Sequence, residues 1–372
     1  MDKYFHSEKL DENKCKGCTN CIKRCPTEAI RVRKGKARII EDRCIDCGEC
    51  IRICPNHAKS AVTDNLDRLK EFRYKVVLPA PSLYGQFSAR VTPDNVLAAL
   101  ISLGFDDVCE VALGAEAVSR AIRQYLEEKK DKRPLISSAC PAVVRLMQVR
   151  FPALLKHIIP MEAPMEVVAR AAKMKSRELG LSPEDVGTFF ITPCPAKVTA
   201  VKQPFGERSH VDGVIAMSDI YGRILKELEK QDEPENQNNY SKASGSGIGW
   251  GRSGGENLAI GKGSLLAVDG IHSVISVLEE IEKGGLCDID YLEAQACIGG
   301  CIGGPLVVQN PFVARVRMRD LVKKYEGYGK PGEFQGLSGL VGLTGPVPPR
   351  PVLKLADDIV SAISKMESLE KT

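Results

Sequence analysis

Two stretches of this chain repeat one spacing of cysteines: KCKGCTNCIKRCP at residues 14–26 and RCIDCGECIRICP at residues 43–55. Each reads C-x2-C-x2-C-x3-C-P, and the second copy begins 29 residues after the first (44 − 15). Four thiols at such short intervals suit a metal better than a disulfide framework. The repeat therefore predicts a small amino-terminal domain, built twice over, whose fold is organised by metal ligands.

The spacing is typical of two [4Fe–4S] clusters, in which three close thiolates of each run bind one cluster and the fourth binds the other. This crossing rule assigns Cys15, Cys18, Cys21 and Cys54 to one cluster, and Cys44, Cys47, Cys50 and Cys25 to the other. A pair of zinc knuckles is the alternative, because C-x2-C alone also suits zinc. The two complete runs, each followed by a proline, favour iron–sulfur. The segment IRVRKGKARII at 30–40 predicts a hairpin between the copies. We interpret residues 1–72 as an α+β ferredoxin-like dicluster domain that transfers electrons.

The composition excludes several classes of protein. Of 372 residues, 43% are hydrophobic, and 52 basic residues against 48 acidic ones leave a formal charge of +4. This balance argues against nucleic acid or an anionic membrane surface as a partner. The chain has no apolar run of about 18 residues or more and starts with a polar segment, so we expect no membrane span and no signal peptide. We therefore expect a cytoplasmic protein with reduced cysteines, which again favours metal binding.

From residue 73 the sequence alternates strand-like and helix-like segments, which predicts an α/β domain over residues 73–372. We expect strands in YKVVLPAPS (74–82), VCEVALG (108–114) and TFFITPCPAK (188–197), and a helix from Thr92 to Gly104. Residues 231–257 are polar and then glycine-rich, which predicts a surface loop that turns inward at its end. Residues 346–372 predict a proline-rich connector and one amphipathic helix.

Four further cysteines stand at the ends of apolar segments, next to proline or glycine. The segments are SSACPA (137–142), TPCPAK (192–197) and ACIGGCIGG (296–304), and the cysteines are Cys140, Cys194, Cys297 and Cys301. Taken singly, each is more often a buried, inert cysteine. Together, behind a ferredoxin-like domain, they predict a third [4Fe–4S] site, because proline and glycine let backbone amides approach cluster sulfurs. Cys109 and Cys287 are assigned to packing, with a local proton carrier as the alternative for Cys287.

These three segments resemble the signature loops of the [FeFe] hydrogenases, TSCCP, PCxxK and ACxxGCxxGG, over about residues 1–330. The resemblance implies two α/β lobes with an H-cluster between them, in which the four loop cysteines bind a [4Fe–4S] cluster and Cys301 bridges to a two-iron unit. That unit carries carbonyl, cyanide and a dithiolate amine. The resemblance also gives Lys197 a role in bonding cyanide, with an ordinary surface lysine as the alternative. It makes Ala80, Pro81 and Ser82 part of the pocket, and places Thr192 and Gln295 where methionines usually precede the loop cysteines.

One position departs from the family's pattern in a way that bears on activity. The first cysteine of TSCCP carries protons from the amine towards solvent in catalytic members, and here it is Ala139, whose methyl group neither donates nor accepts. Ala121 and Ile122 fall near expected glutamates, and MEAPM at 161–165 replaces a serine-containing segment. These departures resemble the sensory branch of the family. We hypothesise that Glu256 and Glu293 form a replacement proton relay, with solvated glutamates as the alternative.

The resulting functional prediction is a sensory [FeFe] hydrogenase that oxidises hydrogen reversibly with low turnover and passes electrons through the two ferredoxin clusters. Its expected partners are H2 and protons, hydrogenase maturases and a redox or signalling protein, and a second copy of the chain is a further candidate. No PAS or phosphatase output domain is recognised, so we expect the signal to leave through a partner or the ferredoxin-like domain. Two alternatives remain: a non-catalytic iron–sulfur carrier like the cytosolic assembly factors, and an electron-transfer subunit lacking the two-iron unit.

Overall fold

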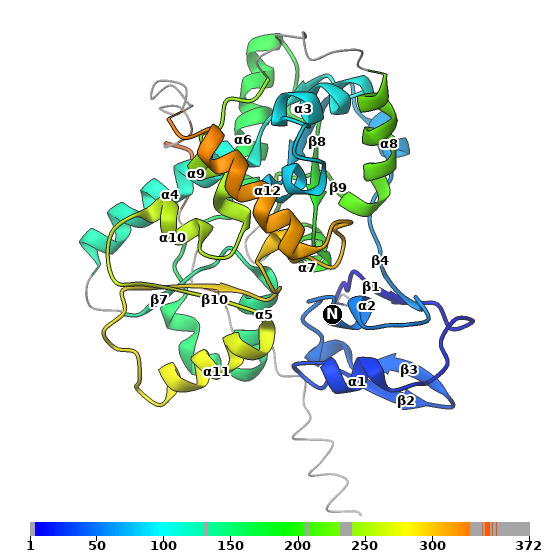
Figure 1. Ribbon diagram of the computed structural model, residues 1–372, viewed down its shortest axis with the longest axis vertical. Helices are drawn as coiled ribbons and strands as arrows, with labels where there is room; N and C mark the ends of the chain where they lie inside the picture. The colour runs from blue at the N-terminus through cyan, green and yellow to red at the C-terminus, as the bar shows by residue number, and fades with distance from the viewer. Residues whose placement is uncertain are drawn as a thin grey trace, which may run out of the picture.

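The computed structural model describes residues 4–129, 133–204, 208–230 and 240–327, and a few positions between 337 and 347 (Figure 1). Its amino-terminal part contains the predicted hairpin, in which β2 (Ile30–Arg33) pairs antiparallel with β3 (Lys36–Ile39). Lys34 and Gly35 form the turn, with φ values of 50° and 72°, because a two-residue turn between twisted strands needs positive φ. β1 (Glu8–Leu10) pairs antiparallel with β4 (Lys59–Ala61). The short helices are α1 (Asn20–Arg24), η1 (Glu41–Arg43), α2 (Glu49–Arg52) and η2 (Leu66–Glu71).

The larger part is built on two parallel sheets, and the first has the strand order β6-β5-β8-β9. Its strands are β5 (Tyr74–Pro79), β6 (Asp107–Val108), β8 (Val186–Thr192) and β9 (Gly213–Ala216). Every residue of β8 is buried, as expected for a central strand covered on both faces. The connecting helices are α3 (Pro93–Ser102), α4 (Val111–Glu128), α6 (Pro164–Lys175), η5 (Ser176–Leu179), α7 (Pro195–Lys202) and α8 (Met217–Glu229).

The second sheet has the order β10-β11-β7 and is also parallel. Its strands are β10 (Leu265–Asp269), β11 (Tyr291–Gln295) and β7 (Leu135–Ile136), and its helices include α5 (Pro141–Arg150), η4 (Pro152–His157) and α11 (Ile271–Glu282). Each sheet has its own apolar core, one around Val77 and Phe189 and the other around Met147 and Leu292. None of the described helices combines the length and apolar composition needed to cross a membrane.

The predicted helix beginning at Thr92 is confirmed, whereas the predicted strand over residues 108–114 is wrong. Thr92 caps α3 by accepting a hydrogen bond from the Asn95 amide, and Pro93 occupies the first turn. In the segment VCEVALG only Val108 belongs to a strand, and α4 begins at Val111. The apolar residues of this segment continue into the buried face of α4, so their spacing follows the helical period and not the alternation of a strand.

The glycine-rich segment is a set of short helices rather than a loop. Residues 231–239 lie outside the described residues, and so does the expected carboxy-terminal connector and helix, apart from position 347. The remainder contains α9 (Gly245–Ile248), η6 (Gly249–Gly251) and α10 (Gly255–Ile260), followed later by η7 (Cys301–Gly303) and α12 (Pro311–Lys324). A Cβ at Gly247 would lie 2.4 Å from the Ala112 carbonyl oxygen, and one at Gly255 2.2 Å from that of Gly249. These glycines therefore permit close packing between backbones, which composition alone does not distinguish from loop flexibility.

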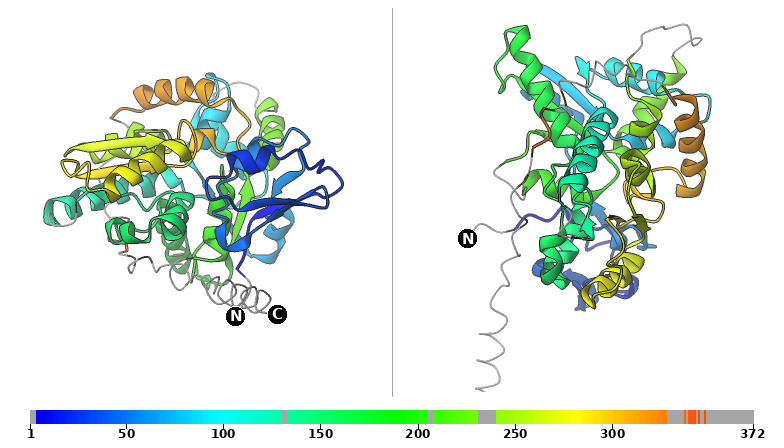
Figure 2. Two further views of the ribbon diagram at one scale, coloured as in Figure 1. Left: turned by 90° about the horizontal axis from the view of Figure 1, so that it is seen from below. Right: turned by 90° about the vertical axis from the view of Figure 1, so that its left-hand side faces the viewer.

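The ferredoxin-like domain packs directly against the loops of the larger part, at the lower right of Figure 1 and at the lower end of the right-hand view of Figure 2. The Ser7 hydroxyl donates a hydrogen bond to the Pro195 carbonyl oxygen at 2.7 Å, and Arg52 donates to the Gly303 carbonyl oxygen at 2.5 Å. Gly48 has a φ of 76°, and a Cβ there would lie 2.4 Å from Pro305 Cγ. The contact thus depends on a glycine inside the second cysteine run.

Gly48→Ala tests this packing, with Gly35→Ala as its matched control. Both glycines have positive φ, so both substitutions carry the strain of an L residue in that conformation. A Cβ at Gly35 meets nothing within 4 Å, whereas one at Gly48 meets Pro305 and Pro195. We expect Gly48→Ala to reduce the free energy of unfolding by about 1–3 kcal/mol more than Gly35→Ala, because overpacking adds to strain. Thermal unfolding followed by circular dichroism measures the difference, and equal losses would show that the contact is not tight.

Candidate metal centre

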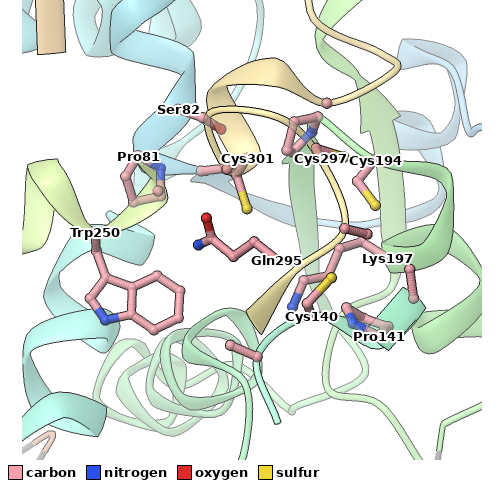
Figure 3. Close-up of a pocket in the computed structure, with 18 of the residues that line it drawn as sticks. Pro81, Ser82, Cys140, Pro141, Cys194, Lys197, Trp250, Gln295, Cys297 and Cys301 are labelled. Atoms are coloured by element: carbon pink, nitrogen blue, oxygen red, sulfur yellow. The ribbon is translucent and has the colours of Figure 1, made fainter. Parts of the chain in front are cut away.

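One cavity between the two sheets is lined by all four scattered cysteines (Figure 3). Cys140 is the residue before α5 and follows β7, and Cys194 is the residue before α7 and follows β8. Cys297 follows β11, and Cys301 begins η7. The strands β7, β8 and β11 are therefore each followed by a cysteine at their carboxyl ends, where parallel sheets usually form their binding sites. We call this space the site cavity.

The thiols of the site cavity suit a metal cluster. Burial raises the pKa of Cys297 to about 11 and that of Cys301 to about 12, and the nearby Cys140 thiol adds to both increases. Burial also raises the pKa of Cys194 well above its usual value. Four thiolates that share one largely apolar cavity cannot all be anionic unless a metal shares their charge. The donor set therefore fits a thiolate-bound iron–sulfur cluster and does not fit a reactive nucleophile.

The cavity also offers polar atoms that have no partner among the described residues. Ser82 Oγ and Gln295 Oε1 are buried, line the site cavity and accept or donate no hydrogen bond there. Buried polar atoms without partners are rare in folded proteins and indicate a polar group in the space before them. About 860 Å³ of the cavity is free of protein atoms, including the part that opens to solvent. The residues present thus fit a polar metal unit larger than a single ion.

Several other residues that the sequence analysis singled out line the site cavity. Lys197, in the first turn of α7, lines the site cavity together with Ala80, Pro81 and Ala139. Pro164 and Met165, from the replaced segment 161–165, also line it. Thr192 does not line the cavity: its hydroxyl accepts a hydrogen bond from the Cys194 amide at 3.2 Å and donates to the Cys194 carbonyl oxygen at 3.1 Å. Thr192 therefore holds the cysteine loop rather than facing the cavity.

Glu256 and Glu293 are both only 1% exposed, so the alternative that they are solvated is wrong. Glu256 lines the site cavity and accepts hydrogen bonds from the Ser137 hydroxyl at 2.9 Å and the Tyr291 hydroxyl at 2.8 Å. Glu293 does not line the cavity and accepts hydrogen bonds from the amides of Gly254 and Asn257, each at 2.9 Å. Burial raises the pKa of both carboxyl groups, and the Glu256 charge adds to the rise at Glu293.

Three residues at this site were not found by sequence reasoning. Ser137 and Tyr291 bind Glu256, and Trp250 lines the site cavity while its indole N–H donates to the Ser119 hydroxyl at 3.1 Å. Ser137 precedes the cysteine by three residues, in the first signature loop, and Trp250 is the chain's single tryptophan. Those facts were available as signals, but only the fold brings Tyr291 to Glu256.

Other sequence assignments have mixed outcomes. Ile122, on α4, is buried in an apolar cluster with Val118 and Leu126 and does not line the site cavity. Cys109 packs against the larger core, and burial raises its pKa to about 12. Cys287 is exposed and donates to the Gly284 carbonyl oxygen at 2.8 Å, so its assignment to packing is wrong.

The eight cysteines of the repeat line two further cavities in the ferredoxin-like domain. The outer cavity is lined by Cys15, Cys18, Cys21 and Cys54, and the inner cavity by Cys25, Cys44, Cys47 and Cys50. This grouping is the one that the crossing rule predicts. Cys47 lines both the inner cavity and the site cavity, whereas Cys18 is exposed at the outer one. The three cysteine sets therefore follow one another from the buried site to the surface.

Comparisons with known proteins agree with this arrangement. Residues 7–55 match the 4Fe-4S dicluster domain. The chain is 31% identical over 213 residues to the periplasmic [Fe] hydrogenase large subunit of Nitratidesulfovibrio vulgaris, covering 52% of this chain and 51% of that protein. It is 24% identical over 354 residues to iron hydrogenase 1 of Clostridium pasteurianum, covering 72% of this chain and 61% of that protein. The chain thus spans between half and two thirds of the length of these relatives.

The fold is also similar to that of a solved hydrogenase. A variant of the [FeFe]-hydrogenase HydA1 from Chlamydomonas reinhardtii superposes with a TM-score of 0.56 at 16% identity, covering 72% of this chain and 89% of that one. Residues 73–305, more than half of the chain, match the family described as iron only hydrogenase large subunit, C-terminal domain. They include all four cysteines of the site cavity. Because this match covers more than half of the chain and includes the four cysteines, the chain belongs to the iron-only hydrogenase family.

Proposed function

We propose that this chain is an [FeFe] hydrogenase of the sensory type, which oxidises H2 reversibly with low turnover. The observation that carries the proposal is one cavity lined by four metal-binding thiols, by Lys197 and by Ala139. When bound there, an H-cluster supplies a Lewis-acidic metal and a pendant amine base for the heterolytic cleavage of H2. We take the two parallel sheets as the two lobes that hold it.

The protein's own groups bind the cofactor and keep its surroundings dry. Cys140, Cys194, Cys297 and Cys301 hold the [4Fe–4S] part, and Cys301 is the proposed bridge to the two-iron unit. The Lys197 ammonium is a cation within an apolar wall, where it stabilises an anionic ligand more than it could in water. Ser82 and Gln295 supply hydrogen bonds to polar ligands, since their buried oxygens have no partner within the described part of the chain.

Protons need a path that does not use residue 139. The Ser137 hydroxyl accepts a hydrogen bond from the Ala139 amide at 3.2 Å and donates to Glu256, so it connects the missing carrier's position to a carboxylate. Because burial raises its pKa, Glu256 can bind a proton near neutral pH and release it again. Glu293 is the next acceptor, and Asp269, which interacts with Glu293 and is half-buried, leads towards solvent.

Electrons leave through the ferredoxin-like domain to a redox or signalling partner. Cys47 lies at the boundary between the site cavity and the inner cavity, and the exposed Cys18 marks the outer end. A sensor needs a redox change that a partner can read, not rapid turnover, so loss of the carrier cysteine is compatible with this role. Assembly of the two-iron unit requires hydrogenase maturases. A cytoplasmic location and a possible homo-oligomer stay predictions.

Ala139→Cys restores a proton donor and acceptor at the first step from the cofactor. We expect it to increase H2 oxidation by roughly tenfold or more in protein loaded with a synthetic two-iron cofactor, because positioned acid–base groups contribute factors of about that size or larger. Ala139→Val, which fills similar space without a proton, is the control. Infrared bands from carbonyl and cyanide establish that each variant is loaded. Native protein that takes up no cofactor would instead support the non-catalytic iron–sulfur carrier.

Glu256→Gln and Glu293→Gln test the relay. Each replacement keeps the shape and the ability to accept hydrogen bonds but cannot exchange a proton, so we expect each to lower H2 oxidation by roughly tenfold or more. Glu116→Gln is the matched control, because Glu116 is also buried and accepts hydrogen bonds from Ser244, yet does not line the site cavity. Unchanged rates in both relay variants would exclude this path.

The pH dependence of stability provides a separate check on Glu256. Folding raises the pKa of Glu256, so the native state favours the protonated carboxyl group. Below the ordinary carboxyl pKa this group does not reduce stability. As the pH rises from that value through the raised pKa, ionisation of the buried group lowers the free energy of unfolding. We expect Glu256→Gln to flatten the fall in thermal stability between about pH 5 and pH 8, by on the order of 1 kcal/mol or more. Denaturation midpoints of wild type and variant across this range measure the effect. Parallel curves would show that Glu256 is ionised without cost.

A further inference from the structure

The internal repeat allows the walls of the outer and inner cavities to be compared position by position. β1 pairs with β4 so that Leu10 lies opposite Lys59, and β2 pairs with β3 so that Ile30 lies opposite Ile39. Leu10 and Ile39 are 29 residues apart, and so are Ile30 and Lys59, so the two strand pairs occupy equivalent positions in the repeat. The two halves are therefore equivalent in fold, and any difference between the cavities comes from side chains.

The charged side chains divide by sign between the two cavities. Among the described residues, the outer cavity is lined by two lysines and no carboxylate, and the inner cavity by three carboxylates and no lysine or arginine. At every equivalent position in the other half the residue is uncharged. The pairs are Lys16 with Ile45, Lys59 with Ile30, Glu8 with Ala37, Asp46 with Gly17, and Glu49 with Asn20.

Glu8 and Lys59 form a buried ion pair that lies between the cavities. Their charged atoms are 2.7 Å apart, and each side chain is 1% exposed. Lys59 lines the outer cavity and Glu8 the inner one, so the pair is a dipole with its positive end towards the outer cysteines. Burial raises the pKa of Glu8, and the Lys59 ammonium opposes that rise. Burial of both side chains also protects this dipole from screening by salt.

The other charged residues that line the two cavities either add to this difference in charge or are nearly balanced by a partner. Asp46 is buried in the inner wall, where His6 Nδ1 contacts it at 2.9 Å. Glu49 is paired with Arg52 at 2.7 Å, so its charge is largely balanced. At the outer cavity, Lys16 is exposed and adds a second cation.

A cluster gains negative charge when it is reduced, so a nearby cation raises its reduction potential and a nearby anion lowers it. We propose that this charge asymmetry gives the outer cluster a higher reduction potential than the inner cluster, so that a single electron rests on the outer cluster. The proposal depends on the two ferredoxin-type clusters alone and holds whether or not the two-iron unit is bound.

The step involved is a one-electron transfer within the domain. The reduced inner cluster loses one electron and the oxidised outer cluster gains it, while no bond forms or breaks and no proton moves. An electron released at the site cavity is thus drawn outward to the cluster beside the exposed Cys18. The partner protein then meets a reduced cluster, and return of the electron to the site is disfavoured.

The double variant Glu8→Ala/Lys59→Ile tests the dipole, because it gives each position the residue that the equivalent half already uses. Replacement of a buried ion pair by apolar residues is often neutral or stabilising, so the domain should fold. Redox titration followed by electron paramagnetic resonance is performed on the full chain with its [4Fe–4S] clusters and without the two-iron unit. In half-reduced protein we expect the ratio of outer-reduced to inner-reduced cluster to fall about tenfold, which is about 59 mV for a one-electron couple.

Lys16→Ile and Lys9→Ile provide an independent comparison. Both lysines are exposed and both changes remove one positive charge, but only Lys16 lines the outer cavity. We expect Lys16→Ile to lower one midpoint potential, which identifies the outer cluster, and Lys9→Ile to leave both nearly unchanged. An unaltered ratio in the double variant, equal effects of the two lysine changes, or a wild-type inner cluster with the higher potential would each overturn the proposal. Absence of hydrogenase activity with this pattern intact would count against the proposed function alone.

Discussion

The structure depends on bringing four thiols from two separate sheets into one dry cavity. A thiol is a weak acid, and burial raises the pKa of Cys194, Cys297 and Cys301 further. Their convergence is unfavourable for the protein without a metal and highly favourable with one, because the metal neutralises the charge that makes each of them a ligand. Three features of the backbone bring the thiols together. Strands end just before the cysteine loops, helices that begin with proline follow Cys140 and Cys194, and glycines flank Cys301.

The need to place cofactor sites close together also explains how tightly the ferredoxin-like domain packs against the larger part. The second cysteine run serves its own cavity and contributes Cys47 to the wall of another, so the contact between domains is also a contact between cofactor sites. Gly48 permits that approach, and Arg52 secures it through the Gly303 carbonyl oxygen. Efficient electron transfer needs such proximity, and a linker of ordinary flexibility could not maintain it.

Local signals in the sequence predicted the parts of the fold that local chemistry controls. The cap at Thr92, the hairpin around Gly35 and the cysteine spacing within each run all involve residues a few positions apart, so the sequence predicts them directly. The segment at 108–114 failed because a buried helix and a buried strand share the same apolar residues over so short a length. The role of Glu256 in a replacement proton relay is a hypothesis from the sequence. The hydrogen bonds of Glu256 to Ser137 and Tyr291 join residues more than thirty positions apart, which only tertiary structure supplies.

Trp250 gives the site cavity an optical property of its own. It is the only tryptophan in the chain, and its indole is buried in the cavity wall with its N–H fixed by Ser119. Iron–sulfur groups absorb broadly across the region where indole emits, and energy transfer falls steeply with distance. Because the indole lines the site cavity, its native fluorescence is most sensitive to the contents of that cavity, and it needs no label or substitution.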